Sequence, residues 1–175
     1  MIEGWFDGCM EPRNPGGHGA WGALVKVDGT KVFESGGYIG HGPAYSNNCS
    51  EYAAFIAVAE EILKHPGVAI IRGDSKLVVM QMNGKWKAKG GLYKPFYEKA
   101  KTVWKKLKSR AKLVWIPRDE NDECDYLSKK VLKDMGIKFR IQPEEDNVFP
   151  KNELSSRIDR DDIEDERRLY RERRK

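Results

Sequence analysis

The sequence predicts an α/β domain with a five-stranded mixed sheet, three antiparallel strands followed by two parallel strands, flanked by helices. Two observations carry this prediction. In residues 2–39, apolar residues alternate with a period of two and short turns separate the runs, which is typical of an antiparallel meander. From residue 48 onward, helical periodicity alternates with two short apolar runs, which is typical of parallel strands joined by helical crossovers.

The meander consists of three predicted strands, at residues 2–10, 20–28 and 31–39. The first strand is apolar and aromatic and contains no proline. A turn rich in proline and glycine follows it, and the dipeptide Asp28-Gly29 is a typical hairpin turn between the second and third strands. Such short connections favour pairing of the three strands in sequence order.

The remainder of the domain alternates helices and strands. Apolar spacing predicts a helix over 48–64, and the fully apolar run 68–71 predicts a buried parallel strand. Further helices are expected from residue 77 and over 92–107, with a last strand over 112–116 and a last helix from Asp119. Right-handed crossovers place the 68–71 strand beside the first strand and the last strand outside it.

Several acidic residues stand at unusual places in this pattern. Asp7 interrupts an apolar strand, Glu51 leads the core-facing stripe of a helix, and Asp74 directly follows a buried strand. A carboxylate in such surroundings is costly unless it is paired, protonated or bound to a metal. Each also has an ordinary alternative, as a turn cap, a complement to the helix dipole and a helix N-cap, respectively. Asp125 is one of five acids at the start of the last helix, in its expected second turn, and spacing alone does not choose among them.

The charge is unevenly distributed. The net charge is +5, but residues 1–142 contain 23 Lys/Arg against 16 Asp/Glu, so the basic part is the predicted domain. Residues 85–110 contain ten Lys/Arg and one acid, with aromatic residues such as Trp86 between them. A solvated helix face is the alternative, but this bias favours a surface that binds phosphates, with Trp86 as a stacking or packing partner.

Cysteine usage and hydropathy suggest the compartment. The three cysteines, Cys9, Cys49 and Cys124, are odd in number and widely spaced, which favours a reducing environment without a disulfide framework. No apolar run reaches membrane-spanning length and the first residues show no signal-peptide pattern. We therefore expect a soluble, cytoplasmic protein that does not contact a membrane.

Four blocks of sequence carry a resemblance to a known family. They are Phe6-Asp7-Gly8, Asn47-Asn48-Cys49-Ser50-Glu51, Gly73-Asp74-Ser75 and Asn121-Asp122-Glu123-Cys124-Asp125-Tyr126-Leu127-Ser128, and the loop Asn14-Pro15-Gly16-Gly17 accompanies them. In this order and at these intervals, they resemble the catalytic blocks of type-1 ribonuclease H. The resemblance covers about residues 1–135 and implies a ribonuclease H-like fold.

The resemblance also implies an activity. Members of the family cut the RNA strand of an RNA–DNA hybrid with two metal ions and leave 5′-phosphate and 3′-hydroxyl ends. The implied catalytic and metal-binding residues are Asp7, Glu51, Asp74 and Asp125. The implied cofactor is a pair of Mg²⁺ ions, with Mn²⁺ as the alternative, because hard cations prefer carboxylate ligands. The expected substrate-binding residues are Asn14, Ser46, Asn47, Asn48, Ser75, Lys76, Trp86 and Lys87. The expected partner is the hybrid, bound by a monomer.

The chain departs from the family pattern in three places. The basic segment at 83–91 is shorter than in many members, no histidine lies between residues 112 and 125, and no arginine precedes the asparagine pair. Glu120 or a neighbouring acid is the candidate substitute for the missing histidine. Two other functions stay open: a catalytically inactive nucleic-acid-binding module of the same fold, and a related nuclease that acts on DNA.

The sequence divides into two parts. Residues 1–142 form the predicted ribonuclease H domain. Residues 143–175 are almost wholly charged after a segment punctuated by proline, and they predict a flexible or loosely docked helical extension. The alternative function of this extension is contact with nucleic acid or with a protein partner.

Overall fold

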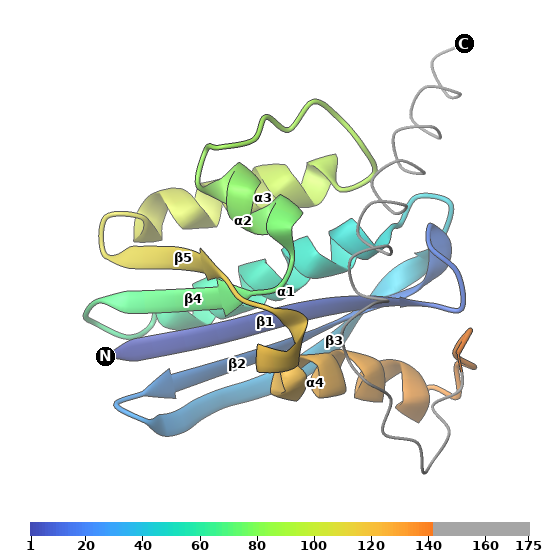
Figure 1. Cartoon of the computed structure of the whole chain (residues 1–175), viewed down its shortest axis with the longest axis horizontal. Coiled ribbons are helices and arrows are strands. Elements are labelled where there is room, and N and C mark those ends of the chain that lie inside the picture. Colours follow the sequence, from blue (N-terminus) through green and yellow to red (C-terminus); the bar gives the residue numbers. More distant parts are fainter. Residues whose placement is uncertain (142–175) are drawn as a thin grey trace.

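One mixed sheet organises the domain. The computed structural model describes residues 1–141, so the predicted extension at 143–175 lies outside the described residues. The strands β1 (Ile2–Glu11), β2 (Gly16–Val27) and β3 (Thr30–Gly42) form an antiparallel meander, and β4 (Ala69–Gly73) and β5 (Ala111–Trp115) are parallel to β1 and β4, respectively. The strand order β3-β2-β1-β4-β5 confirms the predicted five-stranded mixed sheet (Figure 1).

The central strand is β1, which has a paired neighbour on each side. Phe6 lies opposite Ala23 of β2 and opposite Gly73 of β4. The next residue along β1 is Asp7, and the next residue after β4 is Asp74. Parallel β1 and β4 therefore bring these two acids to the same end of the sheet.

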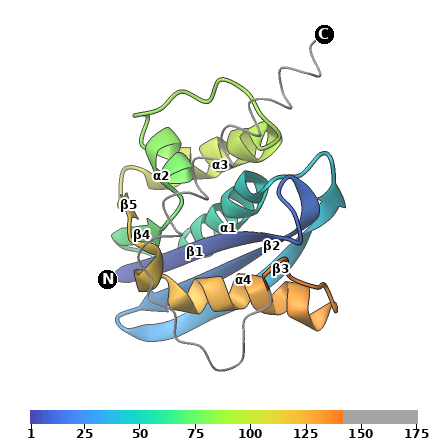
Figure 2. The ribbon, with the colours of Figure 1, turned by 45° about the vertical axis from the view of Figure 1, so that its right-hand side comes forward.

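Helices cover the two faces of the sheet. The helices α1 (Asn47–Ile62), α2 (Lys76–Met82) and α3 (Lys94–Leu107) lie on one side, and α4 (Asp122–Asp134) lies on the other (Figures 1 and 2). Glycines in the sheet let the helices approach closely: a Cβ on Gly4 would lie 2.5 Å from Val58 of α1, and one on Gly22 would lie 2.4 Å from the carbonyl oxygen of Cys124 in α4. In residues 1–141, no helix is long and apolar enough to cross a membrane.

The main hydrophobic core lies between the sheet and the helices α1 and α3. Edge-to-face contacts connect Phe6 of β1 with Phe55 of α1, at 5.6 Å between ring centroids, and Phe55 with Trp104 of α3, at 5.8 Å. All three rings are buried. Such aromatic pairs add to the free energy gained by burying their apolar area, so this core fixes α1, and with it Glu51, against β1.

Two element boundaries differ from the prediction in ways that matter for the site. β3 continues to Gly42 because its last residues pair with the start of β2, which the glycine-rich sequence conceals. The last helix does not begin at Asp119: a separate 3₁₀ turn spans Arg118–Glu120, and α4 begins at Asp122. Asp125 therefore lies in the first turn of α4 and not in the second, because Asn121 interrupts the helix with a non-helical backbone.

Candidate active site

Asp7 lies at the centre of the candidate site, buried in the middle of β1. The glycine after it makes room for a second acid, since a Cβ on Gly8 would lie 2.3 Å from the backbone nitrogen of Glu51. Gly22, opposite Asp7 on β2, makes room for the first turn of α4. The two helices can therefore bring their acids to the same carboxylate.

Three of the predicted acids converge. Asp7, Glu51 and Asp74 each offer a carboxylate oxygen, and these oxygens lie within 4.8 Å of one another. Asp7 and Glu51 are buried and Asp74 is half-buried. Asp74 is not the N-cap of α2, which was the alternative role for this residue. The N-cap is Ser75, whose hydroxyl accepts a hydrogen bond from the backbone nitrogen of Val78 at 3.4 Å. Close carboxylate oxygens that open to solvent on one side suit a hard divalent cation.

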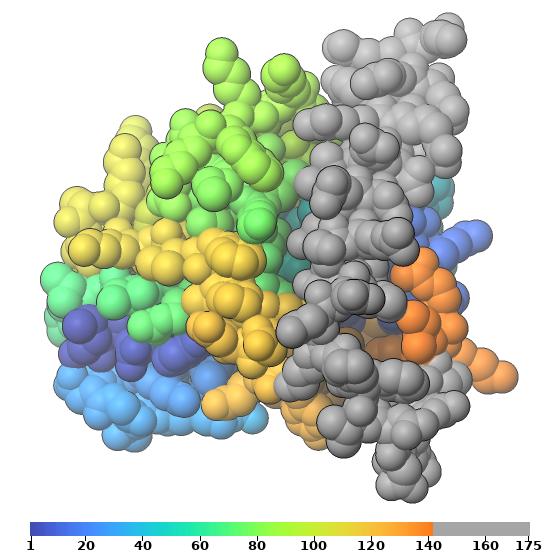
Figure 3. Space-filling model, in the orientation of Figure 1, coloured from blue at the N-terminus to red at the C-terminus, as the bar shows by residue number. Residues whose placement is uncertain are grey.

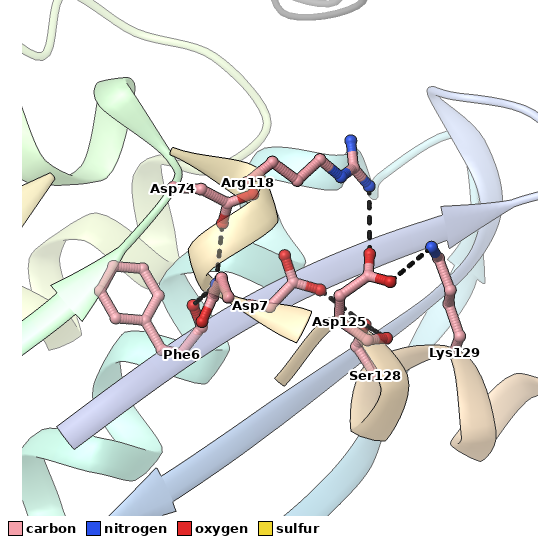
Figure 4. A network of polar contacts seen from close by, with 8 residues as sticks. Phe6, Asp7, Asp74, Arg118, Asp125, Ser128 and Lys129 are labelled. Carbon is pink, nitrogen blue, oxygen red and sulfur yellow. Dashed lines mark hydrogen bonds and ion pairs between the residues drawn. The ribbon is translucent and has the colours of Figure 1, made fainter. Parts of the chain in front are cut away.

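Asp125 lies beside this group with its two oxygens held by cations. Its Oδ1 accepts a hydrogen bond from Arg118 Nη2 at 3.2 Å, and its Oδ2 accepts one from Lys129 Nζ at 2.6 Å (Figure 4). Arg118 and Lys129 therefore neutralise the fourth acid in the structure. Glu120, one of the acids suggested as a substitute for the missing histidine, is exposed in the 3₁₀ turn Arg118–Glu120, and Arg118 of the same turn pairs with Asp125.

Two uncharged side chains connect the acids to the scaffold. Asn121 is buried, and its Nδ2 donates hydrogen bonds to the carbonyl oxygen of Phe6 at 2.8 Å and to Asp74 Oδ1 at 3.0 Å. Ser128 is also buried, and its hydroxyl lies 2.7 Å from Asp7 Oδ2. A single amide thus ties the start of α4 to β1 and to Asp74.

The surroundings of Asp7 disfavour its negative charge. Burial raises the pKa of Asp7 well above its ordinary value, and repulsion from Asp74 and Asp125 raises the pKa further. The hydrogen bond from Ser128 and the charge of Arg118 act in the opposite direction. Although burial lowers the pKa of Arg118, the surrounding carboxylates, Asp7 above all, hold that pKa above its ordinary value. The acids thus form an electrostatically coupled group to which a divalent cation would supply the missing positive charge.

The predicted substrate-binding residues from the first loop and α1 lie together. The Oδ1 atom of Asn14 accepts a hydrogen bond from the backbone nitrogen of Asn47 at 2.8 Å, so the loop before β2 is tied to the first turn of α1. Asn14 and Asn47 are half-buried. Asn48 and Ser46 are buried, and Ser46 is the N-cap of α1, with its hydroxyl 3.5 Å from Cys49 Sγ. Within this set, Asn14 and Asn47 are the residues that reach the surface.

The remaining predicted substrate-binding residues lie at the start of α2 and in the segment that follows it. Ser75 caps α2, and Lys76 is its exposed first residue. Trp86 is 44% exposed and Lys87 is exposed, in the segment between α2 and α3. This segment projects from the rest of the molecule in the ribbon and lies above the gold surface that follows β5 in the space-filling view (Figures 1 and 3). An exposed tryptophan between lysines is available to a nucleic acid.

Four residues that contact the acids were not predicted as site residues from the sequence: Arg118, Asn121, Ser128 and Lys129. The sequence did contain a signal for Ser128 and Lys129, because residues three and four positions after Asp125 share its helix face.

The three cysteines are buried thiols. Burial raises the pKa of Cys9 to about 12 and likewise raises the pKa of Cys124. These two thiols stay protonated at neutral pH, which makes them poor nucleophiles.

This chain is similar to known proteins. Residues 6–131 match a protein family described as reverse transcriptase-like. Ribonuclease HI of Halobacterium salinarum is 31% identical over 134 residues, which are 76% of this chain and 65% of that relative. This chain belongs to the type-1 ribonuclease H family. The crystal structure of RNase H1 from the same archaeon superimposes with a TM-score of 0.66 at 29% identity and covers 76% of this chain and 98% of that one.

Two further proteins are similar to this chain. The structure of LC11-RNase H1 in complex with an RNA/DNA hybrid matches with a TM-score of 0.62 at 26% identity, over 75% of this chain and 99% of that one. The bifunctional protein Rv2228c of Mycobacterium tuberculosis is 34% identical over 122 residues, which are 68% of this chain. The match spans only 32% of the length of that mycobacterial relative.

Proposed function

We propose that this protein is an endonuclease that hydrolyses the RNA strand of RNA–DNA hybrids and leaves 5′-phosphate and 3′-hydroxyl ends. The observation that carries the proposal is the convergence of Asp7, Glu51 and Asp74 within 4.8 Å. The family supports it, since a relative is named ribonuclease HI and another was crystallised with a hybrid. The buried thiols are compatible with the reducing cytoplasm, where we propose that the protein acts as a monomer.

The proposed cofactor is a pair of Mg²⁺ ions, with Mn²⁺ as the alternative. The donor set fits such ions, because it consists of carboxylate oxygens and the buried Asp7 is destabilised by its acidic neighbours. We propose Asp7, Glu51 and Asp74 as ligands, and Asp125 as the fourth once it leaves its ion pairs. Bound ions would supply activation of the attacking water and stabilisation of the leaving 3′ oxygen.

The chain's own residues around these acids would hold the hybrid. We propose that the half-buried amides of Asn14 and Asn47 contact the backbone and the 2′-hydroxyl groups, because an amide offers both a donor and an acceptor. Lys76, Trp86 and Lys87 are exposed and basic or aromatic, which suits phosphate and base contacts. Ser46, Asn48 and Ser75 would act mainly by shaping the helix starts that carry these groups.

The substitution Asp7→Asn tests the proposal. It keeps the shape of the side chain but removes the charge that a cation requires. We expect cleavage of a hybrid in Mg²⁺ to disappear, while binding of the hybrid in Ca²⁺ is retained. Asp28→Asn is the matched control, since Asp28 is an exposed aspartate that pairs with the N-terminal amine; this variant should cleave normally.

The same assay separates the competing functions. A wild-type protein that binds the hybrid but does not cleave it in Mg²⁺ or Mn²⁺ would be the inactive binding module. Preferential cleavage of a DNA duplex in parallel reactions would indicate a DNA nuclease. Cleavage of the RNA strand that stops when a chelator is added supports the proposed function.

A further inference from the structure

Trp115 contacts the candidate site in two ways. It is the last residue of β5, and its indole Nε1 donates a hydrogen bond to the backbone carbonyl oxygen of Asp74 at 2.9 Å. The ammonium of Lys76 lies over the same indole, 4.7 Å from the ring centroid. Asp74 and Lys76 flank the N-cap of α2, so one side chain supports both the acid and the first residue of the helix.

The position of Asp74 explains the need for the first contact. In the β4–β5 ladder, Gly73 pairs with Trp115, and the backbone nitrogen of Ile116 donates to the carbonyl oxygen of Gly73 at 3.1 Å. The ladder ends there, and Asp74 is the first residue beyond it. The hydrogen bond from the indole N–H supports the backbone one residue beyond the ladder, while Asn121 donates to the carboxylate of Asp74 at 3.0 Å.

The position of Lys76 explains the second contact. A cation at the first residue of a helix is disfavoured by the helix dipole, and the first turn of α2 contains no acid that could balance it. Stability of α2 therefore does not account for a lysine there. A cation–π contact holds an ammonium from one side and leaves its other N–H groups directed away from the ring. In the space-filling view, the residues that follow β5, coloured gold, lie beside α2, coloured green (Figure 3).

We propose that Trp115 is a positioning residue with two separable roles in hybrid cleavage. Its N–H group fixes the backbone at Asp74, and its ring face holds Lys76 where the ammonium binds a backbone phosphate of the hybrid. This inference rests on the proposed function. It assigns to one aromatic residue both the alignment of a proposed metal ligand and part of the electrostatic contact with the substrate.

Four variants separate the two roles. Trp115→Phe retains a ring face but loses the N–H donor, and Trp115→Leu loses both. Lys76→Met loses the cation alone, and the double variant Lys76→Met with Trp115→Leu completes a thermodynamic cycle. For each variant, kcat and KM are measured on a short RNA–DNA hybrid in Mg²⁺. Hybrid affinity is measured in Ca²⁺ over a series of salt concentrations, and thermal unfolding verifies that each variant is folded.

The expected pattern differs between the two contacts. Trp115→Phe should lower kcat about five-fold, the effect of one lost hydrogen bond, with hybrid affinity unchanged. Lys76→Met should weaken hybrid binding and reduce the slope of log affinity against log salt by about one. Trp115→Leu should lower kcat in the same way as Trp115→Phe and weaken binding about two- to five-fold, the range of an exposed cation–π contact. The double variant should bind no more weakly than Lys76→Met alone.

Trp5 and Lys26 provide matched controls. The ammonium of Lys26 lies 5.1 Å from the ring centroid of Trp5, on the sheet and outside the candidate site. Trp5→Phe should leave kcat unchanged, and Lys26→Met should leave the salt slope unchanged. Equal losses in the controls and in the Trp115 and Lys76 variants would overturn the inference, because they would indicate general effects of charge and packing.

Other outcomes also decide the question. If Trp115→Phe keeps full kcat, or if the binding losses of Lys76→Met and Trp115→Leu simply add, the inference is wrong while the proposed function stands. If the wild-type protein neither cleaves nor binds the hybrid, the proposed function fails, and this inference fails with it.

Discussion

The hydroxyl of Ser128 lies 2.7 Å from Oδ2 of Asp7 and 3.0 Å from the backbone carbonyl oxygen of Asp125. A hydroxyl has one proton and can donate to only one of these two oxygens at a time. When Asp7 is ionised, the proton of Ser128 belongs in the contact with Asp7. When Asp7 is protonated, it can itself donate to Ser128, which then donates to the carbonyl oxygen. Ser128 therefore accommodates both protonation states of the central acid.

We predict that Ser128→Ala weakens divalent-cation binding. The substitution removes a hydrogen bond that stabilises the ionised carboxylate and lowers the pKa of Asp7, so it favours the protonated form, which cannot bind a cation. A hydrogen bond to a charged group is worth about 1.5–3 kcal/mol, which corresponds to roughly ten-fold or more in cation affinity. Calorimetric titration with Mn²⁺ at neutral pH measures the effect.

Ser50 offers the matched control for this substitution. It is buried next to Glu51, and among residues 1–141 its hydroxyl has no hydrogen-bond partner. Ser50→Ala should leave Mn²⁺ affinity unchanged and should not lower the melting temperature. Equal affinities of the Ser128→Ala variant and the wild-type protein would show that Asp7 does not depend on Ser128.

The raised pKa of Asp7 predicts a pH-dependent stability of the metal-free protein. A folded-state pKa above the unfolded value means that the folded protein holds the proton more tightly. The folded state therefore loses stability as pH rises from the ordinary Asp pKa of 3.8 through the raised pKa. Each pKa unit by which the folded state exceeds the unfolded state lowers the free energy of unfolding above the raised pKa by about 1.4 kcal/mol. Asp7→Asn removes this loss. The variant should therefore have a higher melting temperature than the wild-type protein at neutral pH in the presence of a chelator.

Two measurements verify this assignment. The difference in melting temperature between Asp7→Asn and wild type should shrink toward acid pH, where Asp7 is protonated in both states of the wild-type protein. It should also shrink when Mg²⁺ is added at neutral pH, because the cation stabilises the wild-type carboxylates. A variant that is less stable than wild type in chelator at every pH would refute an electrostatic penalty at Asp7.

Arg118 should compete with a cation for Asp125. The guanidinium of Arg118 donates to Asp125 Oδ1 at 3.2 Å, and the Arg118 side chain is 43% exposed. The substitution Arg118→Met frees this oxygen and removes a positive charge near the site. Exposed ion pairs are worth about 0.2–1 kcal/mol, so we expect Mn²⁺ binding to tighten up to about five-fold. Lys130→Met is the control, because Lys130 pairs with Asp134 in the last turn of α4; weaker Mn²⁺ binding in the Arg118 variant would contradict the prediction.

The fold was predictable from the sequence because its signals are local. Period-two alternation, the Asp28-Gly29 turn and the change to helical spacing each lie within about a dozen residues. They also placed Asp7 and Asp74 on neighbouring strands, as the parallel register of β1 and β4 confirms. The lengths of β3 and of the last helix were predicted less well, since glycines conceal the end of β3 and a cap residue conceals the start of α4.

The polar contacts of the site were not predictable in the same way. The bond from Asn121 to the carbonyl oxygen of Phe6 joins residues 115 positions apart, and that from Ser128 to Asp7 joins residues 121 apart. Both depend on how closely α4 lies on β1. Local spacing could not distinguish Asp125 from its acidic neighbours either. The structure does so, because Glu123 turns outward to pair with Lys26 and Lys31 while Asp125 faces the site.

Asn121→Asp should destabilise the metal-free protein strongly. The Nδ2 atom of Asn121 donates to two acceptors, Phe6 O at 2.8 Å and Asp74 Oδ1 at 3.0 Å. An aspartate at this position replaces the donor by an oxygen, so it faces two acceptors and adds a buried charge to the acidic group. Losing such a buried network and leaving a charge unpaired costs about 3–5 kcal/mol. Thermal and denaturant unfolding in a chelator measure the loss.

Two comparisons show whether repulsion is the cause. Asn121→Ala removes the donor without adding a charge, so it should lose less stability than Asn121→Asp, about 1–3 kcal/mol. Asn83→Asp is the matched control, because the Nδ2 atom of Asn83 also donates to a carbonyl oxygen, that of Leu113 at 3.0 Å, away from the acids. The loss in Asn121→Asp should exceed that in Asn83→Asp and should diminish at acid pH, where the added carboxylate becomes protonated and can donate to Asp74. A loss independent of pH would mean that packing around Asn121, and not its position among the carboxylates, determines its contribution.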